Sequence, residues 1–265
     1  GSISDYSEVI NLNPKYENAF FYRAYAKYEI QDYEGAIADY SEVINLNPKY
    51  ENAFFNRALA KDEIQDYEGS ISDYSEVINL NPKYEKAFFY RSKARDNIGN
   101  ISGAIDDLNV SLDLESNQDK FHDIDSLIYL YFKISDYKNI PFLIKLQKEN
   151  TKNNLSNQSA KEVVIKEAII KYNKGKLSTV TGEKLKAVNY LESSIKELKS
   201  LENNERIQIL NDLIKSQLVW AYIDIKDYQK AKQIIKRRSL DGQLALAFIY
   251  IIEGNSLKSE KIIKR

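Results

Sequence analysis

Cysteine is absent from this chain, and histidine occurs once, at position 122. The lack of cysteine excludes disulfide bonds, thiolate nucleophiles and cysteine-ligated metal ions. A single histidine excludes the paired imidazoles of the zinc-protease motif, and neither a phosphate-binding glycine loop nor a nucleophile elbow occurs. We interpret His122, with Asp123 and Asp125, as surface residues at the start of a helix, where acidic side chains are favoured. We therefore expect no enzyme, catalytic residue, metal or cofactor.

Helix-breaking residues and long apolar runs are also scarce. Only four prolines and nine glycines occur in 265 residues, which leaves long stretches able to continue as helix. The longest apolar run, Leu244 to Ile252, is far shorter than the roughly 20 residues of a transmembrane helix, so we expect no membrane span. Methionine is absent even from position 1, so we expect a piece of a longer chain. We expect a cytoplasmic location, and the missing start leaves the periplasm or secretion open.

What the sequence does contain is a repeat. Pro14, Pro48 and Pro82 are spaced 34 residues apart, each within the same phrase DYSEVINLNPKYE. In each repeat the apolar residues recur at helical spacing in two stretches, separated by a short turn such as Gln31-Asp32-Tyr33. Neither helix can bury its apolar face alone, so successive repeats have to stack. The sequence therefore predicts an all-α solenoid of helix-turn-helix repeats.

The repeat resembles the tetratricopeptide repeat (TPR) family, which has an aromatic residue at position 4, a small residue at 8, alanine at 20, an aromatic at 24 and proline at 32. Repeat one, residues 17–50, has Phe20, Ala24, Ala36, Tyr40 and Pro48 at these positions. Repeat two, residues 51–84, has Phe54, Ala58, Ser70, Tyr74 and Pro82. Repeat three, residues 85–118, keeps the first three positions but has Leu108 and Ser116 at the last two. The resemblance implies a right-handed superhelical solenoid.

All three repeats share a departure from the family, because position 7 is arginine instead of leucine and position 11 is lysine or arginine instead of tyrosine. The resemblance also weakens towards both ends. Residues 1–16 match positions 19–34 and are predicted to be the second helix of a truncated repeat. Residues 119–154 are predicted to be a divergent TPR, and residues 155–265 degenerate TPR-like helical repeats. Within the latter, Gly175 to Gly182 is predicted to break the helix that begins at Ala160.

The resemblance implies that positions 2, 5, 6, 9, 12 and 13 of the first helices face a concave groove. Many of these positions are aromatic here, and aromatic rings give large contact areas at small entropic cost. We predict that the groove binds a peptide segment or helix of another protein through Phe21, Tyr22, Tyr25, Tyr28, Phe55, Asn56, Phe89, Tyr90 and Lys93. Of these, Tyr22, Phe55 and Tyr90 are expected to contribute more to binding than to folding. The alternative, weighted equally, is that Phe21, Phe55 and Phe89 fill the core between repeats.

The charges are divided between the two halves of the chain. Residues 1–118 contain 11 Lys and Arg against 21 Asp and Glu, a net charge of −10, and residues 119–265 contain 27 against 18, a net charge of +9. A candidate basic patch is formed by Lys230, Lys232, Lys236, Arg237 and Arg238. It supports the alternative function, an assembly or regulatory module whose basic half docks on an acidic protein or a nucleic acid. A solvated helix face is the simpler interpretation, and we do not expect nucleic acid as the partner.

The front end of the array is predicted to present an apolar edge. Ile3, Tyr6, Val9 and Ile10 recur at helical spacing in residues 1–16, and no first helix precedes them. Repeat arrays normally have a polar cap at such an end. We therefore expect self-association through this edge.

Overall fold

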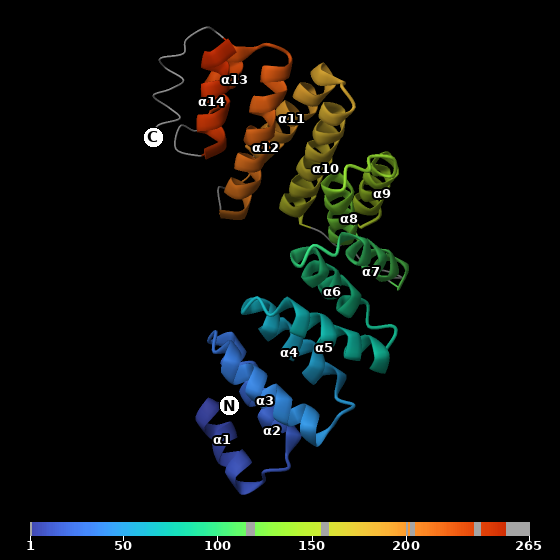
Figure 1. Ribbon diagram of the computed structural model, residues 1–265, viewed down its shortest axis with the longest axis vertical. Helices are drawn as coiled ribbons and strands as arrows, with labels where there is room; N and C mark the ends of the chain where they lie inside the picture. The colour runs from blue at the N-terminus through green and yellow to red at the C-terminus, as the bar shows by residue number, and fades with distance from the viewer. Residues whose placement is uncertain are drawn as a thin grey trace. The chain divides into compact units, whose positions relative to one another are not determined.

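The computed structural model describes residues 2–114, 120–154, 159–199, 201, 205–235 and 240–252. Over these residues the chain forms fourteen α-helices and no strand (Figure 1). The helices are α1 (Ile3–Leu12), α2 (Glu17–Glu29), α3 (Tyr33–Leu46), α4 (Glu51–Glu63), α5 (Tyr67–Leu80), α6 (Glu85–Asn97), α7 (Ile101–Leu114), α8 (Phe121–Lys133), α9 (Ile140–Asn153), α10 (Ala160–Val180), α11 (Lys184–Leu198), α12 (Glu205–Asp224), α13 (Tyr228–Ile234) and α14 (Leu240–Ile252). The fold is thus an all-α array of helix pairs. None of the helices in the described part of the chain has the length and hydropathy needed to cross a membrane.

The chain divides into two compact units, residues Gly1–Leu130 and Tyr131–Arg265. In the N-terminal unit, the three repeats form the pairs α2 with α3, α4 with α5, and α6 with α7. The second helix of each pair also packs on the first helix of the next, as α3 does on α4 and α5 does on α6 (Figure 1). The core of this unit is therefore a series of local interfaces, as stacked repeats require.

The turn within each repeat has a local cause. Gln31 and Gln65 follow the first helices with φ of 66° and 63°, a left-handed conformation that ends a helix. Asp32 then caps α3, because its carboxylate accepts a hydrogen bond from the Gly35 backbone N–H at 3.1 Å. A Cβ on Gly35 would lie 2.2 Å from the Asp32 carboxylate, so a larger residue at this position would require the Asp32 side chain to shift.

The repeat register is confirmed by the packing of the aromatic positions. Phe54 on α4 is 9% exposed and lies in one cluster with Tyr74 and Val77 of α5, as the spacing predicts. Tyr74 is fully buried, and its hydroxyl donates a hydrogen bond to Asp62 at 2.7 Å. Positions 4 and 24 of the repeat are therefore the centre of the pair α4 and α5.

The arginine at position 7 is explained by an ion-pair network. Arg57 donates from Nε and Nη2 to both oxygens of Asp73 on α5, at 2.8 and 2.7 Å, and Lys61 pairs with the same carboxylate at 2.8 Å. Arg57 also donates to Ser41 of the preceding repeat at 3.0 Å, and its guanidinium lies 5.6 Å from the Phe54 ring centroid. The same network recurs in repeats one and three, around Asp39 and Asp107. It links the two helices of a repeat and joins the repeat to its neighbour.

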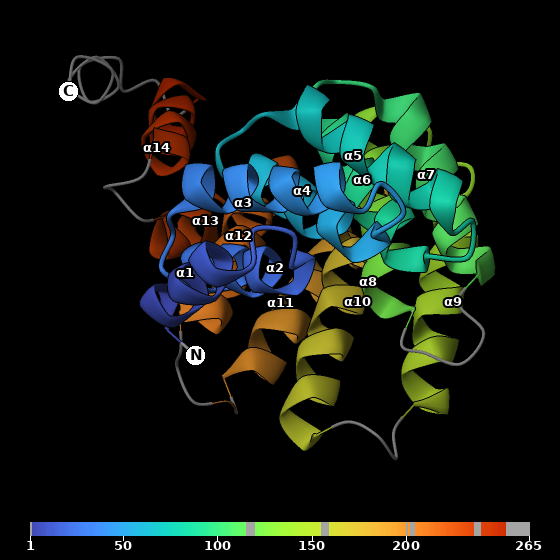
Figure 2. The ribbon, with the colours of Figure 1, turned by 90° about the horizontal axis from the view of Figure 1, so that it is seen from below.

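In the C-terminal unit, α9 and α10 lie side by side (Figure 2), α10 packs on α11, and α11 packs on α12. The prediction of a helix break at Gly175 is wrong, since α10 continues from Ala160 to Val180. A Cβ at Gly175 would lie 2.7 Å from Leu191 of α11, so the glycine allows close helix packing instead. The chain turns later, at Gly182, where φ is 81°.

Candidate protein-interaction surface

The residues predicted to bind a partner in the N-terminal unit differ in exposure. Tyr22 and Tyr25 on α2 are 52% and 50% exposed. The Tyr22 ring stacks on Tyr6 of α1 with centroids 5.9 Å apart, and Tyr25 is hydrogen-bonded to Glu29 one turn along the same helix. The two tyrosines are therefore held by neighbours while half of each side chain remains available to a partner.

Phe55 is buried, with 8% of its surface exposed. Its ring lies 5.1 to 5.7 Å, between centroids, from the rings of Tyr74, Tyr84 and Tyr90. The packing alternative therefore applies to Phe55, contrary to the expectation that it acts more in binding than in folding. Phe21 is half-buried against Tyr40 and Tyr50, at 5.5 and 5.3 Å.

Other predicted rings lie on α2 and on α6. Tyr28 is half-buried and donates from its hydroxyl to Glu63 of α4 at 3.5 Å, and Tyr90 stacks on Tyr74 with centroids 6.1 Å apart. Asn56 donates its side-chain amide to the Asn52 carbonyl at 2.8 Å. We use the name aromatic row for the rings that retain exposed surface, which are Phe21, Tyr22, Tyr25, Tyr28, Phe89 and Tyr90.

Carboxylates lie along the aromatic row and affect its tyrosines. Burial, the nearby Glu63 carboxylate and neighbouring tyrosines raise the pKa of Tyr28 to about 12. The hydrogen bond and charge of Glu29 raise the pKa of Tyr25. Burial also raises the pKa of Asp62, while hydrogen bonds from Ser70 and Tyr74 oppose this change. The aromatic row is therefore bordered by carboxylates.

Lys93 is the cation among the predicted partner-binding residues. Its ammonium lies 4.4 Å from the ring centroid of Phe89 and 5.5 Å from that of Tyr90. Desolvation by these surroundings lowers the pKa of Lys93, and the carboxylates of Asp123 and Asp62 act in the opposite direction. Cation–π contacts and two carboxylates thus hold this side chain at the end of the row.

His122 is exposed in the first turn of α8, in edge contact with Phe121 at 6.0 Å. The neighbouring Asp123 accepts a hydrogen bond from Ser111 at 2.6 Å. In the part of the chain that the structure describes, no group of three His, Asp or Glu residues is placed to hold a metal ion.

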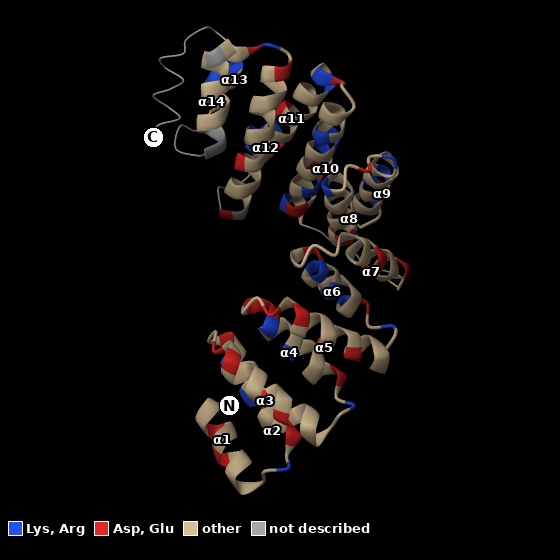
Figure 3. Ribbon diagram, viewed as in Figure 1, with Lys and Arg blue, Asp and Glu red and all other residues tan. Residues whose placement is uncertain are grey.

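The predicted basic patch is partly described. Lys230 is exposed, pairs with Asp227 at 3.6 Å and lies 5.3 Å from the ring centroid of Tyr222. Lys232 lies 5.1 Å from the ring centroid of Tyr250. Lys236, Arg237 and Arg238 lie outside the described residues. Figure 3 shows further basic residues along α10 of the same unit, and all of them are lysines.

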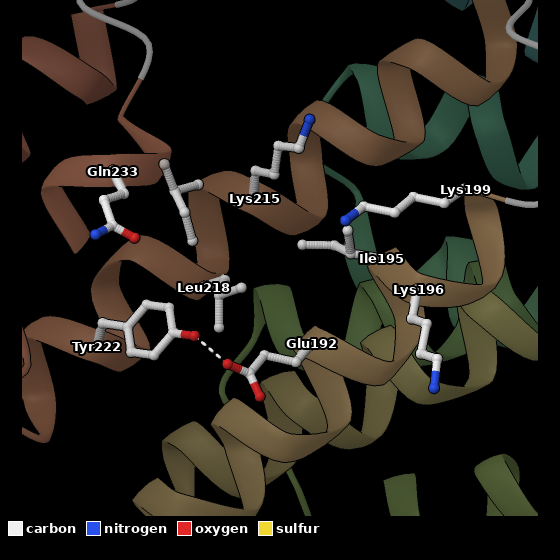
Figure 4. Close-up of a pocket in the computed structure, with 9 residues that line it drawn as sticks. Glu192, Ile195, Lys196, Lys199, Lys215, Leu218, Tyr222 and Gln233 are labelled. Atoms are coloured by element: carbon white, nitrogen blue, oxygen red, sulfur yellow. Dashed lines mark hydrogen bonds between the residues drawn. The ribbon is translucent and has the colours of Figure 1, made fainter. Parts of the chain in front are cut away.

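A lysine-lined pocket of about 510 Å³ in the C-terminal unit lies between α11, α12 and α13. Its apolar part includes Ile195 and Leu218, and the Lys199 and Lys215 side chains lie at one end of it (Figure 4). At the other end the Tyr222 hydroxyl donates a hydrogen bond to Glu192. Sequence periodicity missed this pocket because α11 and α12 meet only in the tertiary structure.

Comparison with known proteins identifies the repeats. The family model described as TPR repeat matches residues 24–61, and the one described as tetratricopeptide repeat matches residues 51–84. No curated protein matches the chain.

Solved structures share the fold at low sequence identity. A crystal structure of MamA aligns over 60% of this chain and 85% of its own, with 16% identity and a TM-score of 0.55. MamA from Desulfovibrio magneticus RS-1 aligns over 57% and 84%, with 15% identity and a TM-score of 0.53. The APC/C hetero-tetramer Cut9–Hcn1 aligns over 96% and 46%, with 11% identity and a TM-score of 0.59. From the matched models and the stacked helix pairs we conclude that this chain contains tetratricopeptide repeats, matched over residues 24–84.

Proposed function

We propose that this protein is a non-enzymatic scaffold that binds a peptide segment or helix of another protein on the aromatic row of its N-terminal unit. The observation that carries the proposal is the exposure of Tyr22 and Tyr25, half of whose surface is open to solvent on the first helix of repeat one. Exposed aromatic side chains gathered on one surface are typical of interaction sites. The neighbours of the two rings hold them in place, which lowers the entropy that binding removes.

We expect the double substitution Tyr22→Ser and Tyr25→Ser to reduce partner capture at least tenfold, because tyrosine hot spots each contribute about 2 kcal/mol or more to binding. Helical circular dichroism should stay unchanged, since both side chains are half exposed. Affinity capture followed by quantitative mass spectrometry measures the effect. Tyr129→Ser is the control, because Tyr129 is 51% exposed but lies on α8, outside the row. Equal capture by all three proteins would contradict the proposal.

A second candidate function is docking of the basic C-terminal unit on an acidic protein through the lysine-lined pocket. Lys199 and Lys215 lie at one end of a pocket whose lining also includes Ile195 and Leu218, which suits a carboxylate next to an apolar side chain. Substitution of the two lysines separates the two functions. A complex on the pocket should weaken on Lys199→Gln with Lys215→Gln, whereas one on the aromatic row should keep its affinity in that variant.

We also propose self-association through α1. Val9 and Leu12 are 36% and 81% exposed, while Ile10 is buried in the cluster that includes Phe20. Contact between this apolar helix face and a second molecule removes apolar surface from water, which is favourable. Light scattering over a concentration series should show a mass increase that Ile3→Lys with Val9→Glu abolishes. A strictly monomeric parent chain at high concentration would show that the idea is wrong.

A further inference from the structure

We infer that the aromatic row recognises a basic segment, whose Lys or Arg side chains lie on the exposed tyrosine rings beside the carboxylates of Glu29 and Glu63. This inference rests on the proposed function and adds the chemistry of the partner. Four observations support it.

The first observation is the pairing of rings with carboxylates. Tyr25 is hydrogen-bonded to Glu29, and Tyr28 donates to Glu63 at 3.5 Å, so each carboxylate lies beside a ring. Both glutamates are exposed, and neither forms an ion pair with a residue that the structure describes. A cation that binds here gains the attraction of a ring face and of a carboxylate together.

The second observation is that one lysine of the chain already lies beside aromatic rings and carboxylates. The Lys93 ammonium lies over Phe89 and Tyr90, at 4.4 and 5.5 Å, and is attracted by Asp123 and Asp62. Lys93 is at position 9 of repeat three, and the residues 34 and 68 positions earlier are Leu59 and Tyr25. Repeat one therefore has rings of the row, and repeats one and two have the carboxylates Glu29 and Glu63, but neither repeat has a lysine of its own at this position.

The third observation explains why the row remains anionic. The cations at positions 7 and 11 of the three repeats point to the second helices, where they pair with Asp39, Asp73 and Asp107. All six are engaged in this way, and they are Arg23, Lys27, Arg57, Lys61, Arg91 and Arg95. They therefore cannot also neutralise Glu29 and Glu63.

The fourth observation is the charge of the surrounding repeats. Residues 1–118 carry 21 acidic against 11 basic side chains, a net charge of −10. Acidic residues are distributed over several helices of the N-terminal unit (Figure 3). Such a field favours the approach of a basic segment and disfavours an acidic one.

The test uses the full chain and a random library of 12-residue peptides displayed on phage. We expect the enriched peptides to contain more Lys and Arg than the starting library. An enriched synthetic peptide, measured by fluorescence anisotropy, should bind about tenfold more weakly to Glu29→Gln with Glu63→Gln, since a charge-assisted contact is lost. Its version with every Lys and Arg replaced by Gln should also lose binding to the parent chain.

The matched control is Glu42→Gln with Glu76→Gln, two exposed glutamates on the second helices α3 and α5. It changes the net charge by the same amount, so a threefold effect or less separates local recognition from the general field. Equal weakening by both pairs would overturn the inference, and so would enrichment of neutral or acidic peptides. If such peptides still depend on Tyr22 and Tyr25, the proposed function stands without the inference. If no enriched peptide depends on these tyrosines, both are wrong.

Discussion

Replacement of Asp73 with asparagine should lower the free energy of unfolding by about 3–5 kcal/mol, because breaking a buried ion pair leaves uncompensated charge behind. The Asp73 side chain is 4% exposed and pairs with both Arg57 and Lys61, whose side chains are 18% and 17% exposed. Without the carboxylate charge, the two cations face each other with little access to water. Urea unfolding followed by circular dichroism at 222 nm measures the change.

Two comparisons make this experiment specific. Glu68→Gln removes a carboxylate from an exposed site on the same helix and should change stability by no more than about 0.5 kcal/mol. Replacing Asp73, Arg57 and Lys61 together with apolar residues of similar size should cost less than Asp73→Asn alone, because no unpaired charge remains. If Asp73→Asn unfolds at the same urea concentration as the parent chain, the network contributes nothing to the stability of repeat two.

The second large effect is expected for Phe54→Ala, which should destabilise the protein by about 3–5 kcal/mol through the cavity that it leaves. Phe54 is 9% exposed, packs in one cluster with the fully buried Tyr74, and carries the Arg57 guanidinium over its ring at 5.6 Å. The substitution therefore removes core packing and also a contact of the ion-pair network. Thermal and urea unfolding both report the loss.

Phe142→Ala is the matched control for Phe54→Ala, because Phe142 is 66% exposed on α9 and its removal leaves no buried cavity. We expect this variant to unfold within about 0.5 kcal/mol of the parent chain. An unchanged melting curve for Phe54→Ala would mean that position 4 does not stabilise the repeat.

Much of the fold could be predicted because the repeat is a local pattern. The 34-residue spacing of Pro14, Pro48 and Pro82 sets the order of helix, turn and helix, and the aromatic positions identify which face is buried. The burial of Phe54 and Tyr74 followed from this spacing. The prediction failed at Gly175, where glycine is read as a helix breaker although here it accommodates Leu191 of another helix.

The candidate site was predictable only in part. Phe55 and Tyr22 occupy neighbouring positions of the repeat, yet Phe55 is 8% exposed and Tyr22 is 52% exposed. The difference arises because Tyr74, Tyr84 and Tyr90 enclose Phe55, whereas Tyr22 contacts chiefly Tyr6 and Phe21. No periodicity along one helix encodes how many rings the neighbouring helices bring to a position.

The sequence by itself determined the helix pairs of the three repeats, their register and the kind of repeat, because each depends on residues close together in the chain and repeated at a constant interval. The tertiary structure alone decided which rings stay exposed and which cations are used internally. Arg57 and Asp73 are 16 residues apart, and nothing in the local pattern requires their bidentate contact at 2.7 and 2.8 Å. That contact directs the arginine to the second helix, and among the described residues no cation pairs with Glu63 on the first helix. Side-chain pairing of this kind depends on distances that only packing sets.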